Sequence, residues 1–239
     1  MMKKIILLII VSISFQQTEA QGLKGLLNKA KEAVTRKPSS LTNDDIISGL
    51  KEALVIGSQK GSTSLSQVDG FFANAALKII LPPEAQKVET AFRNLGLNRQ
   101  VDEAILSINR AAEDACKSAA PIFSNAIKQM RFQDAFVILK GSDTAATAYL
   151  RGKTSNDLTA AFRPVIDQSL LKVGATKYWS TLMTNYNKFS PQKINPDLGA
   201  YVTERALNGI FYQVAIEEKS IRKDPFARTS EILKKVFAK

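Results

Sequence analysis

The sequence contains no histidine and a single cysteine among its 239 residues. Without histidine, the chain cannot form a Ser-His-Asp or Cys-His triad, a His-ligated zinc site or an imidazole general base. The lone Cys116 cannot close a disulfide within the chain or supply a cluster of metal ligands. The commonest hydrolase sites are therefore excluded, and no sequence signature indicates a cofactor, a metal or a catalytic residue.

Charged residues are also sparse, at 23% of the chain, whereas hydrophobic residues make up 45%. This balance is typical of a folded domain. Basic side chains outnumber acidic ones by 33 to 22, a net charge of +11, which suits acidic partners. The basic residues are nevertheless scattered and form no nucleic-acid-binding motif, so we expect a solvated basic surface and do not expect nucleic acid as a partner.

The amino terminus has the pattern of a secretory signal peptide. Lys3 and Lys4 precede an apolar run over residues 5–11, and a small-residue exit follows at Ala20. The run is shorter than the roughly 20 apolar residues of a spanning helix. We therefore expect cleavage near Ala20 and a mature chain that is periplasmic or secreted, without a transmembrane span. The alternative is an uncleaved amino-terminal anchor.

The excess of basic residues belongs to the expected mature chain. Removing residues 1–20 takes away two lysines and one glutamate, so the net charge falls only from +11 to +10. Residues 21–37 combine apolar residues at helical spacing with five basic side chains, which predicts a basic amphipathic helix. This helix could contact an anionic membrane surface peripherally, or pack on its own domain. Residues 38–40 then form a linker to a domain over residues 41–239.

From residue 41 onward the apolar residues follow helical periodicity, which predicts an all-α domain, a single globular bundle of about ten helices. The clearest stretch contains Val101, Ala104, Ile105, Ile108, Ala111, Ala112, Ala115, Cys116 and Ala119. Many of these residues are small, which indicates a closely packed helix. Cys116 lies on this stripe, so we expect it to be a buried small hydrophobe.

Helix boundaries follow from capping residues and from glycine and proline. Thr42 is a predicted amino-terminal cap for a helix that ends near residues 57–61. Residues 79–81, before two prolines, form the only segment where a very short extended stretch is expected. Further along, a helix is expected to start after residues 142–144 and to end near Arg151.

Three more boundaries complete the prediction. A new helix is expected to begin at Thr154, and Pro164 should kink or restart it. Asp197 should cap the longest helix of the protein, running to about Lys223. Residues 224–225 then separate it from a final helix.

Three charged side chains of this long helix form the first candidate site. At about 100° per residue, Glu204, Glu218 and Arg222 project into the middle of its apolar side. Because a buried charge must be paired, Glu218 and Arg222, one turn apart, are expected to pair with each other. Two interpretations remain open, an ion pair that locks helix packing or the polar floor of a ligand pocket.

The second candidate site is the start of the helix that follows residue 141. Asp143, Thr147 and Arg151 lie there, and the free N–H groups of a helix amino terminus suit an anion. The alternative is that Ser142 or Asp143 caps the helix and uses those donors.

Several short strings occur in one order along residues 41–237 and carry a family resemblance. Among them are Gly49-Leu50-Lys51-Glu52-Ala53-Leu54, Asn109-Arg110-Ala111-Ala112-Glu113, Phe162-Arg163-Pro164, Tyr201-Val202-Thr203, and Glu217-Glu218 with Ile221-Arg222. Through this combination the chain resembles the bacterial family known as domain of unknown function 4197. The resemblance implies an exported, mostly helical protein whose role is not assigned, and it carries over no catalytic residue.

Three hypotheses about function follow. The first is a non-enzymatic ligand-binding or interaction protein of the cell envelope, holding a small apolar or anionic ligand or an envelope component. The second is an enzyme in which Glu204 or Glu218 acts as acid or base and Arg222 clamps an anion. The third is a purely structural or assembly role. The sequence makes no prediction of the oligomeric state or of the ligand's identity.

Overall fold

The computed structural model describes residues 41–191 and 197–238. The predicted signal peptide, residues 1–20, and the predicted basic arm and linker, residues 21–40, lie outside the described residues. Within the described ranges the chain forms nine α-helices, two 3-10 turns and no strand, which confirms the all-helical prediction. The elements are α2 (Asn43–Leu65), η1 (Pro83–Ala85), α3 (Gln86–Asn94), α4 (Asn98–Cys116), α5 (Ala119–Gln129), α6 (Ala135–Lys140), α7 (Ala145–Lys172), α8 (Ala175–Phe189), α9 (Leu198–Lys223), η2 (Pro225–Ala227) and α10 (Glu231–Phe237).

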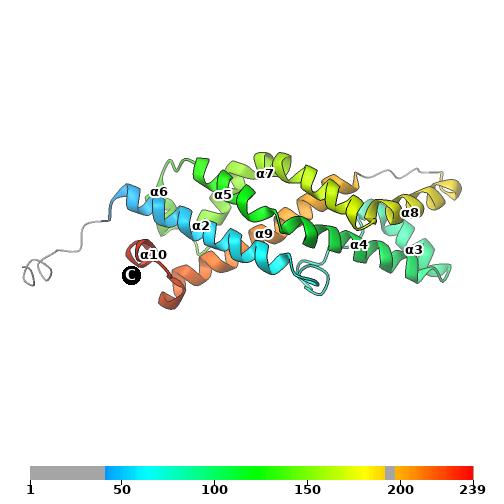
Figure 1. Cartoon of the computed structure of the whole chain (residues 1–239), viewed down its shortest axis with the longest axis horizontal. Helices are drawn as coiled ribbons and strands as arrows, with labels where there is room; N and C mark the ends of the chain where they lie inside the picture. Colours follow the sequence, from blue (N-terminus) through cyan, green and yellow to red (C-terminus); the bar gives the residue numbers. More distant parts are fainter. Residues whose placement is uncertain (1–40, 192–196, 239) are drawn as a thin grey trace, which may run out of the picture. The chain divides into compact units, whose positions relative to one another are not determined.

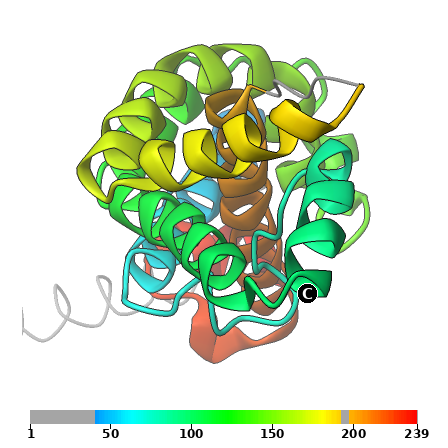
Figure 2. The same cartoon turned by 90° about the vertical axis from the view of Figure 1, so that its right-hand side faces the viewer.

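Helix α9 lies in the middle of the packed helices, with α2, α4 and α7 against it. Figure 2 shows α9 inside a ring of neighbouring helices, and α8 crossing over α4 and α7. The core is continuous through these contacts. It includes the fully buried Leu50 of α2, Ile108 of α4, Phe162 of α7 and Ile210 of α9. The apolar stripes found in the sequence therefore face one another across a single core, and Cys116 is buried in it as expected.

Helix α2 continues past the point where glycine was expected to end it. Gly57 and Gly61 lie inside the helix, which runs on to Leu65. A Cβ on Gly57 would lie 3.2 Å from the Cα of Val214, and one on Gly61 would lie 2.8 Å from the Cβ of Gln213. The predicted end was wrong because these glycines allow α2 and α9 to approach closely rather than break the helix.

Helix α7 is also longer than predicted. The expected breaks at Arg151, Thr154 and Pro164 all fall inside one helix of 28 residues, which makes α7 rather than α9 the longest helix described. Thr154 is buried and donates its hydroxyl to the carbonyl of Leu150 instead of capping a new helix. Pro164 frees the carbonyl of Ala160, and Ala160 is exposed, so water can satisfy that group.

The predicted caps at the ends of the long elements are confirmed. Thr42 and Asp45 form a reciprocal capping box at the start of α2. The side chain of Asp197 accepts from the backbone N–H of Ala200 at the start of α9. Residues 79–81 have no strand partner in the described part of the chain, where no strand occurs. No described helix has an apolar stretch long enough to cross a membrane.

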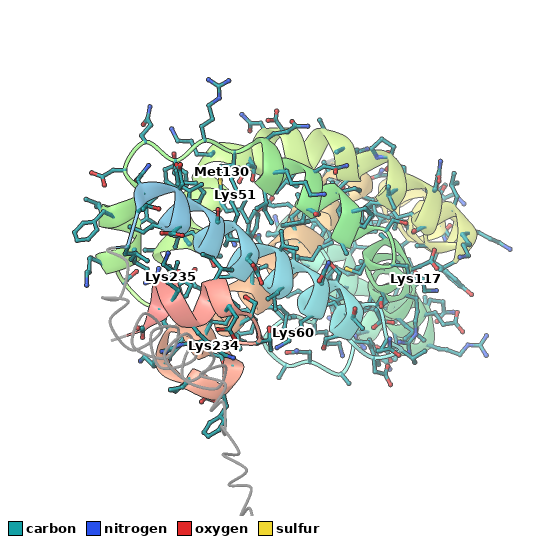
Figure 3. All side chains as sticks on the ribbon, turned by 60° about the vertical axis from the view of Figure 1, so that its left-hand side comes forward. Lys51, Lys60, Lys117, Met130, Lys234 and Lys235 are labelled. Atoms are coloured by element: carbon teal, nitrogen blue, oxygen red, sulfur yellow. The ribbon has the colours of Figure 1, made fainter. Side chains whose placement is uncertain are left out.

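Helix α10 packs beside the first turns of α2, as Figure 1 shows. Figure 3 labels four lysines of these two helices, Lys51, Lys60, Lys234 and Lys235, and each of them has a polar partner. Lys235 pairs with Asp45 at 2.7 Å, Lys60 pairs with Glu217 of α9, and Lys51 donates to the carbonyl of Lys128. Much of the basic charge on this side of the molecule is therefore engaged in holding helices together.

Candidate functional site

Glu218 and Arg222 form a buried ion pair, as their spacing predicted. The guanidinium Nη2 of Arg222 lies 2.8 Å from Oε1 of Glu218, and the two side chains are 10% and 0% exposed. Both oxygens of Glu218 also accept from the start of α7. The backbone N–H groups of Ala146 and Thr147 donate at 2.9 and 2.7 Å, and the Thr147 hydroxyl donates at 2.6 Å. A side chain of the protein itself therefore occupies the anion site at this helix amino terminus.

Arg222 extends the same network to a third segment, α6. Its guanidinium donates to the carbonyls of Leu139 and Ile138, at 2.6 and 3.1 Å, which lie in the last turn of α6. A cation at this position suits the carboxyl terminus of a helix, where the last carbonyls have no partner in a following turn and the helix dipole is negative. Because the oxygens of Glu218 are fully used by these donors, the pair joins α6, α7 and α9 and offers no free carboxylate.

Two sequence expectations about these segments were wrong. The alternative of capping by Ser142 or Asp143 is wrong, because Thr144 is the residue before α7 and the N–H groups of Ala146 and Thr147 donate to Glu218 instead. Asp143 instead pairs with Lys223 at 2.6 Å, and this hydrogen bond lowers the pKa of the Asp143 carboxyl. Glu204 was expected to point inward but is exposed, because no helix in the described part of the chain covers that edge of α9.

A cavity of about 480 Å³ lies directly beside this network. Its walls come from three segments far apart in the sequence, residues 76–78, the start of α7 and the middle of α9. Thr147 and Arg151, two residues of the predicted anion site, line it. Other side chains of its walls are Lys78, Thr144, Ala148, Arg205, Asn208, Tyr212 and Ala215. Glu204, Glu218, Arg222 and Asp143 are not among its lining residues.

The charged residues of this cavity, here named the basic pocket, are all cations. Lys78, Arg151 and Arg205 line it, and none of them forms an ion pair with a described residue. Aromatic faces hold them instead. The Nζ of Lys78 lies 4.2 Å from the centre of the Phe72 ring. The Cζ of Arg151 lies 4.4 Å from the centre of the Phe211 ring, and that of Arg205 lies 5.3 Å from the centre of the Tyr201 ring.

Holding a cation on an aromatic face leaves its charge uncancelled. A guanidinium that lies over a ring still presents its N–H groups in its own plane, where they can meet an anion. One N–H group of Arg151 donates to the side-chain oxygen of Asn208 at 2.6 Å, and this hydrogen bond fixes the orientation of the Arg151 guanidinium. The pocket therefore combines positive charge, orientation and access from the surface.

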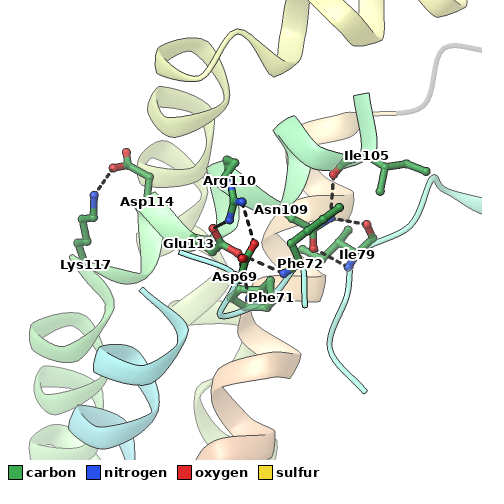
Figure 4. A network of polar contacts seen from close by, with 10 residues as sticks. All are labelled: Asp69, Phe71, Phe72, Ile79, Ile105, Asn109, Arg110, Glu113, Asp114 and Lys117. Carbon is green, nitrogen blue, oxygen red and sulfur yellow. Dashed lines mark hydrogen bonds and ion pairs between the residues drawn. The ribbon is translucent and has the colours of Figure 1, made fainter. Parts of the chain in front are cut away.

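The wall that carries Lys78 is held in place from α4 (Figure 4). Asn109 is fully buried, and its side chain pairs with both backbone groups of Ile79, accepting from the N–H at 2.9 Å and donating to the carbonyl at 2.7 Å. Its amide also donates to the carbonyl of Ile105. These contacts replace the strand pairing that the segment lacks, and they fix the backbone next to Lys78.

Glu113, one turn further along α4, holds the earlier part of the same segment (Figure 4). Its carboxylate accepts from the backbone N–H groups of Phe71 and Phe72, at 3.1 and 3.2 Å, and from Arg110 at 2.6 Å. Arg110 in turn reaches Asp69, the one described non-glycine residue with a positive φ. The string Asn109-Arg110-Ala111-Ala112-Glu113 thus acts as a clasp on residues 69–79, and Phe72 under this clasp carries Lys78 on its ring.

Two of the three cations of the basic pocket, Lys78 and Arg205, were not predicted as site residues from the sequence. Arg205 is exposed on α9, and the sequence does not reveal that it lies near Arg151. The only local pattern in the sequence that points to this pocket is the spacing of Arg205, Asn208 and Tyr212, which places the three residues on one side of a helix. Lys78 belongs to no such pattern, because its position depends on the clasp from α4.

Two other cavities differ in charge. One of about 590 Å³ between α5 and α7 contains Asp157 together with Lys153 and Arg131. Another of about 670 Å³, beside α3 and α8, is lined mainly by apolar side chains. Among the described residues, no group of three or more acidic or cysteine side chains is placed to share a metal ion. The basic pocket is therefore the site at which charge and shape coincide.

Comparison with known proteins identifies the family. A family described as "Protein of unknown function (DUF4197)" matches residues 40–238. The chain belongs to this family. No curated protein and no solved structure gives a significant match. The part of the chain that matches the DUF4197 family contains the clasp, the Glu218–Arg222 pair and every wall of the basic pocket.

Proposed function

We propose that this member of the DUF4197 family is an exported, non-enzymatic binding protein of the bacterial cell envelope that holds a small anionic ligand in the basic pocket. One observation carries the proposal: Lys78, Arg151 and Arg205 converge on one cavity of about 480 Å³ with no acidic side chain among its lining residues. The volume is in the range of cavities that bind small molecules.

The same geometry gives no support to a carboxylate-dependent enzyme. A general acid or base must reach its substrate with an available oxygen. The oxygens of Glu218 are taken up by Ala146, Thr147 and Arg222, and Glu204 is exposed and does not line the pocket. A purely structural role would require the three cations to be incidental, and a search for a bound ligand distinguishes the two.

Export is supported by the charged, apolar and small-residue pattern of residues 1–20. The ligand would then be an anion available outside the cytoplasm, such as an envelope component. Fractionation of the producing cells tests this part separately. Shortened protein in the periplasm or medium is expected, whereas unprocessed protein in the cytoplasm would contradict export.

Native mass spectrometry of the full chain, purified from a bacterium that naturally makes it, tests ligand binding. We expect the protein to carry a small molecule that is released on collisional activation. The double substitution Arg151→Gln and Arg205→Gln should abolish this mass increment. Arg99→Gln is the matched control, because Arg99 is exposed on α4 and its one ion pair with a described residue is to Glu103, at 3.5 Å.

Two results would contradict the proposal. In the first, the double variant keeps the same small molecule while its circular dichroism spectrum stays unchanged, which would place the ligand elsewhere. In the second, the native protein carries nothing and its melting temperature does not rise with inorganic phosphate or pyrophosphate. Either outcome would favour the structural role.

A further inference from the structure

The basic pocket has two chemically different ends. Helices α7 and α9 run antiparallel, because Thr147 near the start of α7 meets Glu218 late in α9, while Arg163 late in α7 meets Asp197 just before α9. The hydrogen bond between Arg151 and Asn208 places Arg151 beside Asn208 along the axis of α9, and this position is the charged end of the pocket. Arg205 lies less than one turn from Asn208, so both guanidinium groups belong to this end.

Lys78 belongs to the same end. Ile80, two residues later, accepts a hydrogen bond from the hydroxyl of Tyr201 at 3.1 Å. Phe71, seven residues earlier, packs on Gly209, where a Cβ would lie only 2.7 Å from the ring. The segment therefore runs along α9 from Gly209 toward Tyr201. This direction brings Lys78 to the level of Arg205.

The other end of the pocket is uncharged. Tyr212 and Ala215 lie about 6 and 10 Å beyond Asn208 along α9, and Ala148 and Thr144 lie back toward the start of α7. Because the helices are antiparallel, these four residues share one end. Tyr212 is 46% exposed, and neither its hydroxyl nor its ring face is engaged by another described residue.

We infer that the ligand is a small amphiphilic anion, with one acidic group at Lys78, Arg151 and Arg205 and a flat or short apolar body lying on Tyr212. The inference rests on the proposed function and adds the chemical class of the ligand. A phosphate or carboxylate group fits the guanidinium forks. An exposed aromatic ring, a few ångströms from unpaired cations, matches the apolar part of the same molecule.

Isothermal titration calorimetry of the full chain at low salt tests this with matched probes. Phenyl phosphate is compared with inorganic phosphate, benzoate with acetate, and benzyl alcohol serves as the uncharged probe. In at least one pair, the aromatic anion should bind about tenfold more tightly than the simple anion, and benzyl alcohol should give no binding heat. The pair with the tighter aromatic complex identifies the acidic group.

Two single substitutions separate the two ends. Tyr212→Ala should remove the roughly tenfold advantage of the aromatic anion and leave the simple anion unchanged. Arg205→Gln should weaken both. Because both side chains are exposed, neither substitution removes core packing, and circular dichroism checks the fold.

The outcomes distinguish this inference from the proposed function. If aromatic and simple anions bind equally and Tyr212→Ala has no effect, the amphiphile is ruled out and anion binding stands. If no anion binds, if Arg205→Gln changes nothing, or if benzyl alcohol binds as tightly as phenyl phosphate, both proposals fail.

Discussion

The carboxylate of Glu218 accepts hydrogen bonds from both the backbone N–H and the hydroxyl of Thr147, at 2.7 and 2.6 Å, across the contact between α9 and α7. Thr147 also lines the basic pocket. The buried pair that was a candidate site in the sequence is therefore the support of the pocket and not its floor. The helix amino terminus is filled internally, and the positive charge open to a ligand comes from side chains beside it.

Replacing Glu218 should be strongly destabilising. Glu218→Gln leaves Arg222, which is 10% exposed, without its charge partner, and we expect the free energy of unfolding to fall by about 3 kcal/mol. Urea unfolding at pH 7, followed by circular dichroism, measures the change. The neighbouring Glu217→Gln is the control, because Glu217 pairs with the exposed Lys60 and should cost less than about 1 kcal/mol. Equal effects would contradict the role given to Glu218.

The clasp from α4 gives a second prediction. Asn109→Ala leaves the N–H and carbonyl of Ile79 without their partner, so the free energy of unfolding should fall by about 2 kcal/mol. Hydrogen exchange at the Ile79 amide should also accelerate more than at core amides of α9. Asn98→Ala, at an exposed position of the same helix, should change stability by no more than about 0.5 kcal/mol. Unchanged exchange at Ile79 in the Asn109 variant would disprove the clasp.

Two glycine-to-alanine substitutions should act in opposite directions. Gly152 lies inside α7, where an added Cβ would meet no atom within 4 Å, so Gly152→Ala should stabilise the protein by about 1 kcal/mol. At Gly49 a Cβ would lie 2.6 Å from the Cγ2 of Val236, so Gly49→Ala should cost about 1–3 kcal/mol. Thermal unfolding of both variants measures this, and a stabilising Gly49→Ala would refute the close packing of α2 and α10.

Stability at acid pH should depend on Asp45. Hydrogen bonds from Lys235 and from the hydroxyl and N–H of Thr42 lower the pKa of Asp45 from 3.8 to about 2. The folded state therefore binds this proton less readily than the unfolded state. The stabilisation is complete above pH 4 and is lost as the pH falls toward 2.

The stability difference between the native protein and Asp45→Asn should accordingly shrink as the pH is lowered from 5 to 2. Urea unfolding at several pH values measures it. Asp44→Asn is the control in the same turn, because no described residue hydrogen-bonds to that side chain. A difference that stays constant over this range would contradict the pKa shift.

The helices could be predicted from the sequence because their apolar periodicity reflects burial in one core. The errors arose at glycine and proline residues that the folded structure accommodates inside a helix. Gly57 and Gly61 bring α2 against α9, and Pro164 lies where the freed carbonyl meets water, so none of them ends a helix. Local sequence rules assign a break at such residues, whereas tertiary contacts decide whether the break occurs.

The candidate site shows the same limit. Glu204 and Arg222 are 18 residues apart, five full turns, so they lie at the same angle around α9. Arg222 is covered because the end of α6 meets it, while Glu204 remains exposed. A helical wheel gives the angle of a side chain but not the neighbour that covers it. The convergence of Lys78, Arg151 and Arg205 depends on contacts between distant segments, so no local pattern reveals it.

The most direct test of the central claim observes the guanidinium groups of the pocket themselves. Nuclear magnetic resonance can follow the Nε–Hε signals of Arg151 and Arg205 while phenyl phosphate and, in a second titration, benzoate is added to the full chain, and the tighter of the two anions decides the test. Both signals should shift and saturate with one common dissociation constant, while the signal of the exposed Arg99 stays in place. Unshifted signals of Arg151 and Arg205, or an equal shift at Arg99, would contradict a built anion site.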